Sequence, residues 1–140
     1  MHKLLLAGVF LFTSVLIGKS QVTGFWRTVD DRTGSEKSVI EIYEQGDRLH
    51  GRIIKLLSGA TYTTCENCTG ELKGKPLIGM NIFYDLEKSE SGRIDGKVLD
   101  PNNGKLYSCY LEMAGPDVLK LRGYIGVTSL GRTQYWYRVD

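Results

Sequence analysis

The sequence has no hydrophobic run of comfortable membrane-spanning length, which takes about 20 apolar residues. Its longest apolar run, residues 4–17, follows a short basic start. The small residues Gly18 and Ser20 come next, and this three-part layout is typical of a secretory signal peptide. We expect residues 1–20 to be removed and residues 21–140 to form one exported domain, periplasmic or secreted. An uncleaved membrane anchor is the alternative.

Net charge is also lacking once the predicted signal peptide is set aside. The chain has 18 Lys and Arg against 16 Asp and Glu, but Lys3 and Lys19 lie in residues 1–20, which contain no acid. Residues 21–140 therefore carry 16 basic and 16 acidic side chains, without a basic run. Such a composition has no electrostatic footprint for a nucleic acid or an anionic membrane, so we expect no nucleic acid partner.

Histidine is scarce as well, because residues 21–140 contain only His50. A Ser/His or Cys/His nucleophile pair would have to use it, yet it alternates with Arg52 on the face of its predicted strand that points to solvent. Asp30 and Asp31 lie in the connection DDRTG and are interpreted as turn formers. We therefore expect a protein that is not an enzyme and carries no cofactor. An enzyme of unfamiliar type would need acids or arginines gathered in one pocket.

What is present is alternation by twos, with no sustained helical stripe. The connection DPNNG, residues 100–104, is rich in turn formers. The alternation predicts eight strands, at residues 25–29, 38–44, 48–57, 77–86, 92–99, 105–113, 118–127 and 132–139. We expect an all-β fold, a single eight-stranded antiparallel up-and-down barrel with no major helix. A flattened two-sheet sandwich is the alternative.

One set of alternate positions is assigned to the interior of this barrel. Its members are mostly apolar, and its three glycines either let a strand bend sharply or leave room in the lumen. The set consists of Ile40, Ile42, Leu49, Gly51, Ile53, Ile94, Gly96, Val98, Tyr107, Cys109, Leu111, Met113, Leu119, Leu121, Gly123 and Ile125.

The two ends of the domain resemble the calycin superfamily, which includes the lipocalins. Gly24-Phe25-Trp26 is similar to its Gly-x-Trp signature, and Arg138 stands where a basic partner from the last strand is expected. The resemblance implies that the Trp closes one end of the barrel and that the Arg packs over it. Gly24, Trp26 and Arg138 are therefore the predicted barrel-closure residues.

A longer resemblance covers nearly all of residues 21–140. The successive blocks CENCTG, KPLIGMNI, GKVLDPNNGKLYSCYLEM, LKLRGYIG and LGRTQYWYRV are similar to those of an uncharacterised bacterial family, domain of unknown function 2147. This resemblance implies an exported bacterial protein with a lipocalin-like barrel. It brings no established activity with it.

Two cysteines stand close together in the stretch CENC. Two thiols in a loop of an exported protein are usually joined, so we predict a disulfide between Cys65 and Cys68 that shapes the loop 58–75. A redox site is one alternative, but the βαβ setting that lowers a thiol pKa is missing. A zinc site is another, and it would need two more ligands. Cys109 is interpreted as an inert core thiol, and no metal is expected.

Tyrosine and tryptophan rings are frequent, and in a barrel with a cavity they would line an apolar pocket with a few hydrogen-bonding tips. Arg122 and Arg132 lie near glycines and either bind an acidic ligand head or are solvated strand charges. The predicted ligand-binding residues are Tyr107, Leu111, Leu121, Arg122, Tyr124 and Trp136. The hypothesis is a barrel that binds a small, partly apolar molecule, such as a lipid fragment or an acidic amphiphile. The alternative is a filled barrel whose loops, including CENC, recognise a protein of the cell envelope.

Overall fold

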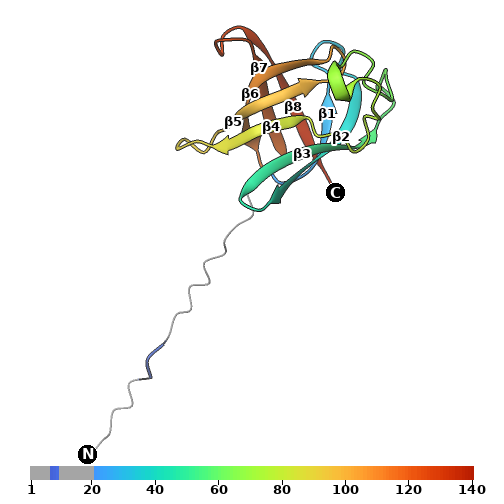
Figure 1. The fold of residues 1–140 in the computed structure, drawn as a ribbon. Coiled ribbons are helices and arrows are strands. Elements are labelled where there is room, and N and C mark those ends of the chain that lie inside the picture. The colour runs from blue at the N-terminus through green and yellow to red at the C-terminus, as the bar shows by residue number, and fades with distance from the viewer. Residues whose placement is uncertain (1–6, 10–20) are drawn as a thin grey trace, which may run out of the picture.

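The computed structural model describes residues 7–9 and 21–140, so the predicted signal peptide lies outside the described residues except at 7–9. Residues 21–140 form eight strands and one short 3-10 turn, η1 (Figure 1). Their bounds are β1 Gly24–Val29, β2 Glu36–Gln45, β3 Arg48–Leu56, η1 Gly70–Leu72, β4 Phe83–Lys88, β5 Ile94–Asp100, β6 Lys105–Gly115, β7 Val118–Tyr124 and β8 Gly131–Val139.

The strands form a single antiparallel sheet in the order β3-β2-β1-β8-β7-β6-β5-β4, which curls until β3 and β4 approach each other (Figure 1). The segment 79–82 joins these two edges. The amide of Ile53 donates to the carbonyl of Met80, and the amide of Ile82 donates to the carbonyl of Gly51, both at 3.0 Å. The predicted eight-stranded up-and-down barrel is confirmed, and it is nearly closed.

Two strands are markedly shorter than the alternation predicts, whereas the others differ from it by no more than a few residues at their ends. The strand expected at 77–86 begins only at Phe83, because the residues before it are used to join β3. The strand expected at 118–127 ends at Tyr124, because the chain turns through Gly126 with a φ of 75°. Ile125 is 66% exposed, so its assignment to the interior is wrong.

Apart from Ile125, the predicted interior residues lie on the inward face of the barrel wall. Ile40, Ile42, Ile94, Leu111 and Leu119 are less than 2% exposed. Leu49, Tyr107 and Met113 are half-buried near the two ends of the barrel. Burial of these aliphatic side chains is the main stabilising contribution to the fold, at about 1.5–3 kcal/mol for each fully buried side chain.

The three interior glycines have different roles. A Cβ at Gly51 would collide with the ring of Phe83, which occupies that space. A Cβ at Gly96 would lie 2.8 Å from the carbonyl oxygen of Tyr84, because β4 bulges at this point. A Cβ at Gly123 would meet nothing within 4 Å. Two of the glycines therefore allow close approach, and Gly123 leaves room in the lumen.

The two ends of the barrel differ, and we name them for what fills them. The closed end carries the start of β1 and the end of β8, and Trp26 fills it with no exposed surface. The mouth is the opposite end, surrounded by the connections 30–35, 57–82, 101–104 and 125–130. Inward-facing residues are half-buried at both ends, Leu49 and Met113 at the closed end and Tyr107 and Gln134 at the mouth, but at the mouth the inward position of Gly123 is unfilled.

Candidate functional site

The wall of the mouth is built by β6, β7 and β8 around the gap that Gly123 leaves. The strand register places Gly123 between Cys109 on β6 and Arg132 on β8. One step deeper in the register, Leu121 lies between Leu111 on β6 and Gln134 on β8. Both leucines are buried. The gap therefore has a packed apolar floor and a half-buried rim.

A chain of polar side chains runs from the rim into the barrel. Arg132 donates from its Nε to Asp31 Oδ2 at 2.8 Å and makes a second, closer contact from Nη2 to Oδ1. Gln134 Nε2 donates to the same Asp31 Oδ1 at 3.3 Å. The indole N–H of Trp136, a residue that is only 3% exposed, donates to Gln134 Oε1 at 3.0 Å. A bidentate Arg–carboxylate pair of this kind is strong and directional.

Charge at the rim is largely neutralised by this ion pair. Partial burial by itself raises the pKa of Asp31, but hydrogen bonds from Arg132 and Gln134 outweigh it, so the pKa lies below its ordinary value of 3.8. The hydrogen bond with Asp31 raises the pKa of Arg132. Both groups therefore stay ionised at neutral pH, and the carboxylates of Asp30 and Asp100 lie near enough to add to the rise in the pKa of Arg132.

Tyr107 forms the rim on the β6 side. Its hydroxyl accepts a hydrogen bond from Asn103 Nδ2 at 2.8 Å, and Asn103 lies in the turn between β5 and β6. A phenol that accepts in this way still has its own O–H proton to donate. Tyr107 can therefore offer a hydrogen bond to a molecule held at the mouth.

The six residues predicted to bind ligand lie at three different depths and on two faces. Tyr107 is at the mouth, whereas Leu111, Leu121 and Trp136 are packed in the core, at 0%, 6% and 3% exposure. Arg122 and Tyr124 alternate with Leu121 and Gly123 on β7, so they belong to the outer face. A single pocket cannot be lined by all six residues, because the wall of the barrel separates Arg122 and Tyr124 from the other four.

Two residues of the mouth were missed by the sequence analysis. Asp31 was interpreted as a turn former, and Gln134 was not identified as a candidate. Their partnership joins residues 103 positions apart in the chain. Alternation places Gln134 on the inner face, but nothing in the sequence indicates that the turn 30–35 folds over it.

The closed end has the arrangement that the calycin resemblance implies. Arg138 lies across the indole of Trp26, and its Nη1 donates to the carbonyl of Thr23 at 3.0 Å. The indole N–H of Trp26 donates to the carbonyl of Val22 at 2.8 Å. Gly24 has a φ of 132°, and a Cβ there would lie 2.6 Å from Arg138 Nη1. A side chain at position 24 would therefore displace the arginine.

The predicted disulfide between Cys65 and Cys68 is present, and both cysteines are buried. It holds a loop that packs beside the turn between β5 and β6. Asn67 Nδ2 donates to the carbonyl of Asn102 at 2.7 Å, and a Cβ at Gly104 would collide with the backbone of Asn67. The disulfide loop thus lies on the β5–β6 side of the mouth.

Cys109 is a free cysteine with no exposed surface. Burial raises the pKa of its thiol to about 12, and the nearby Asp95 adds to the shift. Since the thiolate is the reactive form, this thiol is inert at neutral pH.

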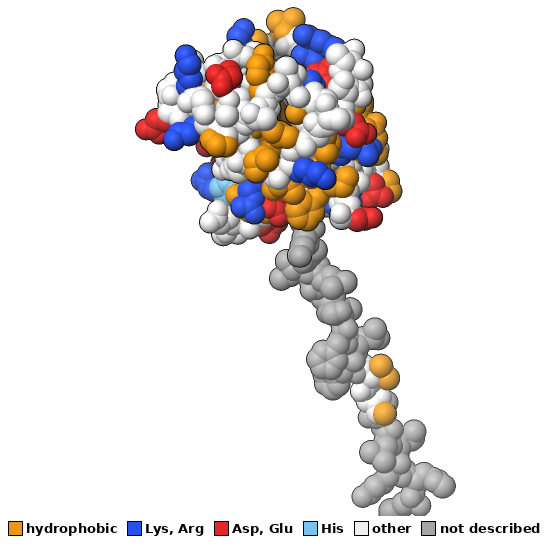
Figure 2. Space-filling view, turned by 90° about the vertical axis from the view of Figure 1, so that its right-hand side faces the viewer, with side chains coloured by type: hydrophobic (Ala, Val, Ile, Leu, Met, Phe, Trp, Pro, Cys, Tyr) orange, Lys and Arg blue, Asp and Glu red, His pale blue; other side chains and the backbone are white. Residues whose placement is uncertain are grey.

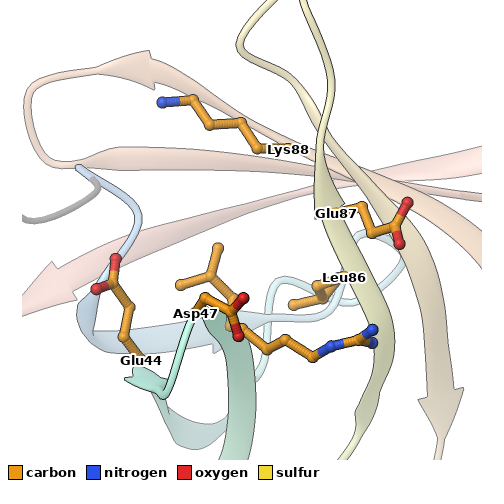
Figure 3. A pocket seen from close by; sticks show the side chains of 7 residues that line it. Glu44, Asp47, Leu86, Glu87 and Lys88 are labelled. Carbon is orange, nitrogen blue, oxygen red and sulfur yellow. The ribbon is translucent and has the colours of Figure 1, made fainter.

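A separate hollow of about 380 Å³ lies near the closed end, where the edge strands β3 and β4 face each other. It sits between the turn that joins β2 to β3 and the end of β4 (Figure 3). Its lining mixes both signs of charge with two leucines: Glu44, Asp47, Arg48, Leu49, Leu86, Glu87 and Lys88. In Figure 3, Leu86 points toward the hollow, whereas Glu87 and Lys88 extend along and away from the strand. None of the polar residues of the mouth lines this hollow.

The face drawn in Figure 2 carries apolar side chains through its middle and charged side chains of both signs around them.

In the part of the chain that the structure describes, His, Cys, Asp and Glu side chains form no group of three or more that could hold a metal ion. Within residues 7–9 and 21–140, no helix is long and apolar enough to cross the bilayer.

Comparison with family models decides the family. Residues 24–138 match the model of DUF2147, which is described as an uncharacterized protein conserved in bacteria. The chain belongs to this family. The fold of this DUF2147 member is similar to that of protein HP1028 from the human pathogen Helicobacter pylori, which is described as belonging to the lipocalin family. The TM-score is 0.74 at 18% sequence identity, over 87% of this chain and 85% of the other. At this identity the likeness shows the fold alone. Among curated proteins there is no match.

Proposed function

We propose that this DUF2147 protein is an exported, non-enzymatic barrel that binds a small, partly apolar molecule at its mouth. The observation that carries the proposal is the gap at Gly123, where an inward-facing position lacks a side chain and a Cβ would meet nothing within 4 Å. Sites for small molecules combine an apolar surface with a few fixed polar groups. The packed floor beneath Gly123 supplies the apolar surface, and the rim supplies the polar groups.

The depth of the barrel limits the ligand. Leu111 and Leu119 have no exposed surface, and Trp26 fills the closed end, so a long chain cannot enter the centre. The ligand is therefore short, or only its end enters. Its apolar part lies over Leu121, and its polar part meets the Tyr107 hydroxyl and the Gln134 amide.

Arg132 sets a condition on an acidic ligand. Its guanidinium is already paired with Asp31, so an incoming carboxylate or sulfonate has to compete with that pair. A ligand with a neutral polar head avoids this competition. An acidic amphiphile is accepted more weakly, at an energetic cost for separating the existing ion pair.

The proposal is tested by a substitution that fills the gap at Gly123. Gly123→Leu places an aliphatic side chain in the mouth, while the matched control Lys97→Leu adds the same side chain at an exposed position of the β5 wall. The probe is anilinonaphthalene sulfonate, titrated by fluorescence against the folded protein. We expect Gly123→Leu to weaken binding at least about tenfold, which is roughly 1.4 kcal/mol, and the control to bind like the wild type. Unchanged affinity in Gly123→Leu would refute binding at this mouth.

Native mass spectrometry of protein purified from its own cell envelope identifies the natural ligand. A small organic mass that is lost on denaturation supports the proposal. The same spectrum reports whether residues 1–20 have been removed and whether the protein is exported in processed form.

A second candidate function is recognition of an envelope protein, favoured by the packed centre of the barrel. The connection 57–82, which includes the disulfide, would provide this surface, because Ile78 is 56% exposed and Tyr62 is 36% exposed on it. A photo-crosslinking residue at position 78, used in living cells, tests the idea, with the exposed position 97 on the outer face of β5 as control. A partner captured from position 78 and not from position 97 supports recognition by the loop. Capture from neither counts against it.

A further inference from the structure

The connection between β7 and β8, residues 125–130, carries three of the most exposed aliphatic side chains of the domain. Ile125, Val127 and Leu130 are 66%, 57% and 66% exposed. This connection, which we call the apolar turn, extends beyond the strands at the top of Figure 1. Residues 123–131 contain no charged side chain. An exposed apolar group of this kind is usually a site of interaction.

The apolar turn has a defined shape. The amide of Ile125 donates to the carbonyl of Leu130 at 3.1 Å, and the amide of Leu130 donates to the carbonyl of Val127 at 3.0 Å. Arg122 reaches up from the outer face of β7, and its Nε and Nη2 donate to the carbonyl of Thr128 at 3.0 and 2.9 Å. The three aliphatic side chains are therefore presented by an ordered backbone.

The same hydrogen bonds prepare the turn for an apolar medium. Carbonyls that accept a hydrogen bond within the protein belong to Ile125, Val127, Thr128, Ser129 and Leu130. A backbone group that loses water without finding a partner costs several kcal/mol in hydrocarbon. Because most carbonyls of this turn are already paired, the cost of taking it out of water is lowered.

We propose that the apolar turn inserts into the interfacial region of a lipid bilayer and holds the mouth of the barrel against the membrane surface. Two observations favour a bilayer over a protein partner. The turn is convex and offers three side chains, whereas a stable protein interface buries roughly 800 Å² on each partner. Its lack of charge fits a surface that needs no complementary side chains, and binding to lipid scales with buried apolar area.

Vesicle flotation of the processed protein tests this directly. We expect binding to vesicles of phosphatidylethanolamine and phosphatidylglycerol, and also to vesicles of phosphatidylcholine alone. Binding is insensitive to salt, because the inserted residues are uncharged. Val127→Ser and Leu130→Ser each weaken the partition constant about tenfold. The matched control Tyr135→Ser removes a ring that is 45% exposed on the wall of β8 and leaves partitioning unchanged.

A reporter variant keeps the test independent of folding losses. Trp26 and Trp136 are buried, so a Val127→Trp substitution adds an exposed indole to the apolar turn. Its emission shifts to the blue on addition of vesicles and is quenched by brominated lipid. Absence of both changes, or equal flotation of Val127→Ser, Leu130→Ser and the wild type, overturns the proposal. So does capture of a protein partner by this turn in place of lipid. Binding of anilinonaphthalene sulfonate, which reports on Gly123, is measured in the same variants and distinguishes failure of this inference from failure of the ligand site.

Discussion

The guanidinium of Arg138 lies over the indole of Trp26, with its Cζ 4.4 Å from the ring centroid. The same group donates to the carbonyls of Gln21 and Thr23 and forms an ion pair with Asp117. One side chain thus connects the last strand, the first strand and the residues that precede the barrel.

Loss of this contact should destabilise the closed end. We expect Arg138→Gln to lower the free energy of unfolding by about 2–3 kcal/mol, because a cation–π contact and the hydrogen bonds to two carbonyls are lost together. Urea unfolding measures the change. The control is Arg93→Gln, which removes a guanidinium 4.2 Å from the Tyr110 ring on the outer wall and should cost less than about 1 kcal/mol. Equal losses in both variants would contradict a special role for Arg138.

Neutralising Asp31 should change what the mouth accepts. In Asp31→Asn the guanidinium of Arg132 loses its carboxylate, so the affinity for anilinonaphthalene sulfonate should rise about threefold to tenfold. Glu36→Gln makes the same change in net charge on the outer wall, where Glu36 pairs with Arg27, and should leave the affinity unaltered. A fluorescence titration decides between them. An equal rise in both variants would indicate a general charge effect.

The same ion pair should make stability depend on acid. Because the pKa of Asp31 is lowered on folding, its contribution is fully present above the unfolded value of 3.8 and is lost as the pH falls through the lower folded value. The stability difference between wild type and Asp31→Asn should therefore be constant near neutrality and shrink below pH 3.8. Urea midpoints measured at several pH values test this. A difference that persists at the lowest pH would show that the pair is not its source.

Cys109 should be protected from alkylation in the folded protein. Its pKa is raised on folding from 9.0 to about 12, so its contribution to stability is present below pH 9 and is lost as the pH rises toward 12. With iodoacetamide at neutral pH, we expect no label on the native protein and one label after unfolding without reductant. Mass spectrometry counts the labels. Labelling of the native protein would show that the core opens at this position.

Reduction of the disulfide should loosen its loop and leave the barrel intact. The ring closed by Cys65 and Cys68 is short, so the chain-entropy contribution is at most about 2 kcal/mol. Hydrogen exchange should accelerate in residues 57–82 and stay slow in β6 and β7. After reduction and unfolding, three cysteines are labelled where one was labelled before. Accelerated exchange throughout the barrel would show that the disulfide supports the whole fold.

Features that depend on neighbouring residues could be predicted from the sequence, whereas features that depend on contacts between distant segments could not. The interior positions of β5 and β6 were predicted because alternation is a local property that burial imposes on each strand. The end of β7 was missed because alternation continues through Ile125, and only the turn at Gly126 ends the strand. Gly51, Gly96 and Gly123 could not be told apart, because their roles depend on Phe83, on the β4 bulge and on an empty space.

The candidate site was predicted less well than the fold. Tyr107 was placed correctly at an inward position, whereas Arg122 and Tyr124 were grouped with it although they lie on the outer face. The pairing of Asp31 with Arg132 and Gln134 joins the β1–β2 turn to strand β8, near the opposite end of the chain. A sequence pattern carries no distance between such segments.

The sequence by itself determined the number of strands, the inward face of most of them and the cysteine pair, because each leaves a mark within a few neighbouring positions. The residues that close the barrel were predicted from the calycin resemblance. Only the tertiary structure decided which end is open, which glycine leaves space and how the charge of Arg132 is satisfied. These features arise when the sheet curls and brings β1, β7 and β8 side by side, so they depend on contacts between segments far apart in the chain.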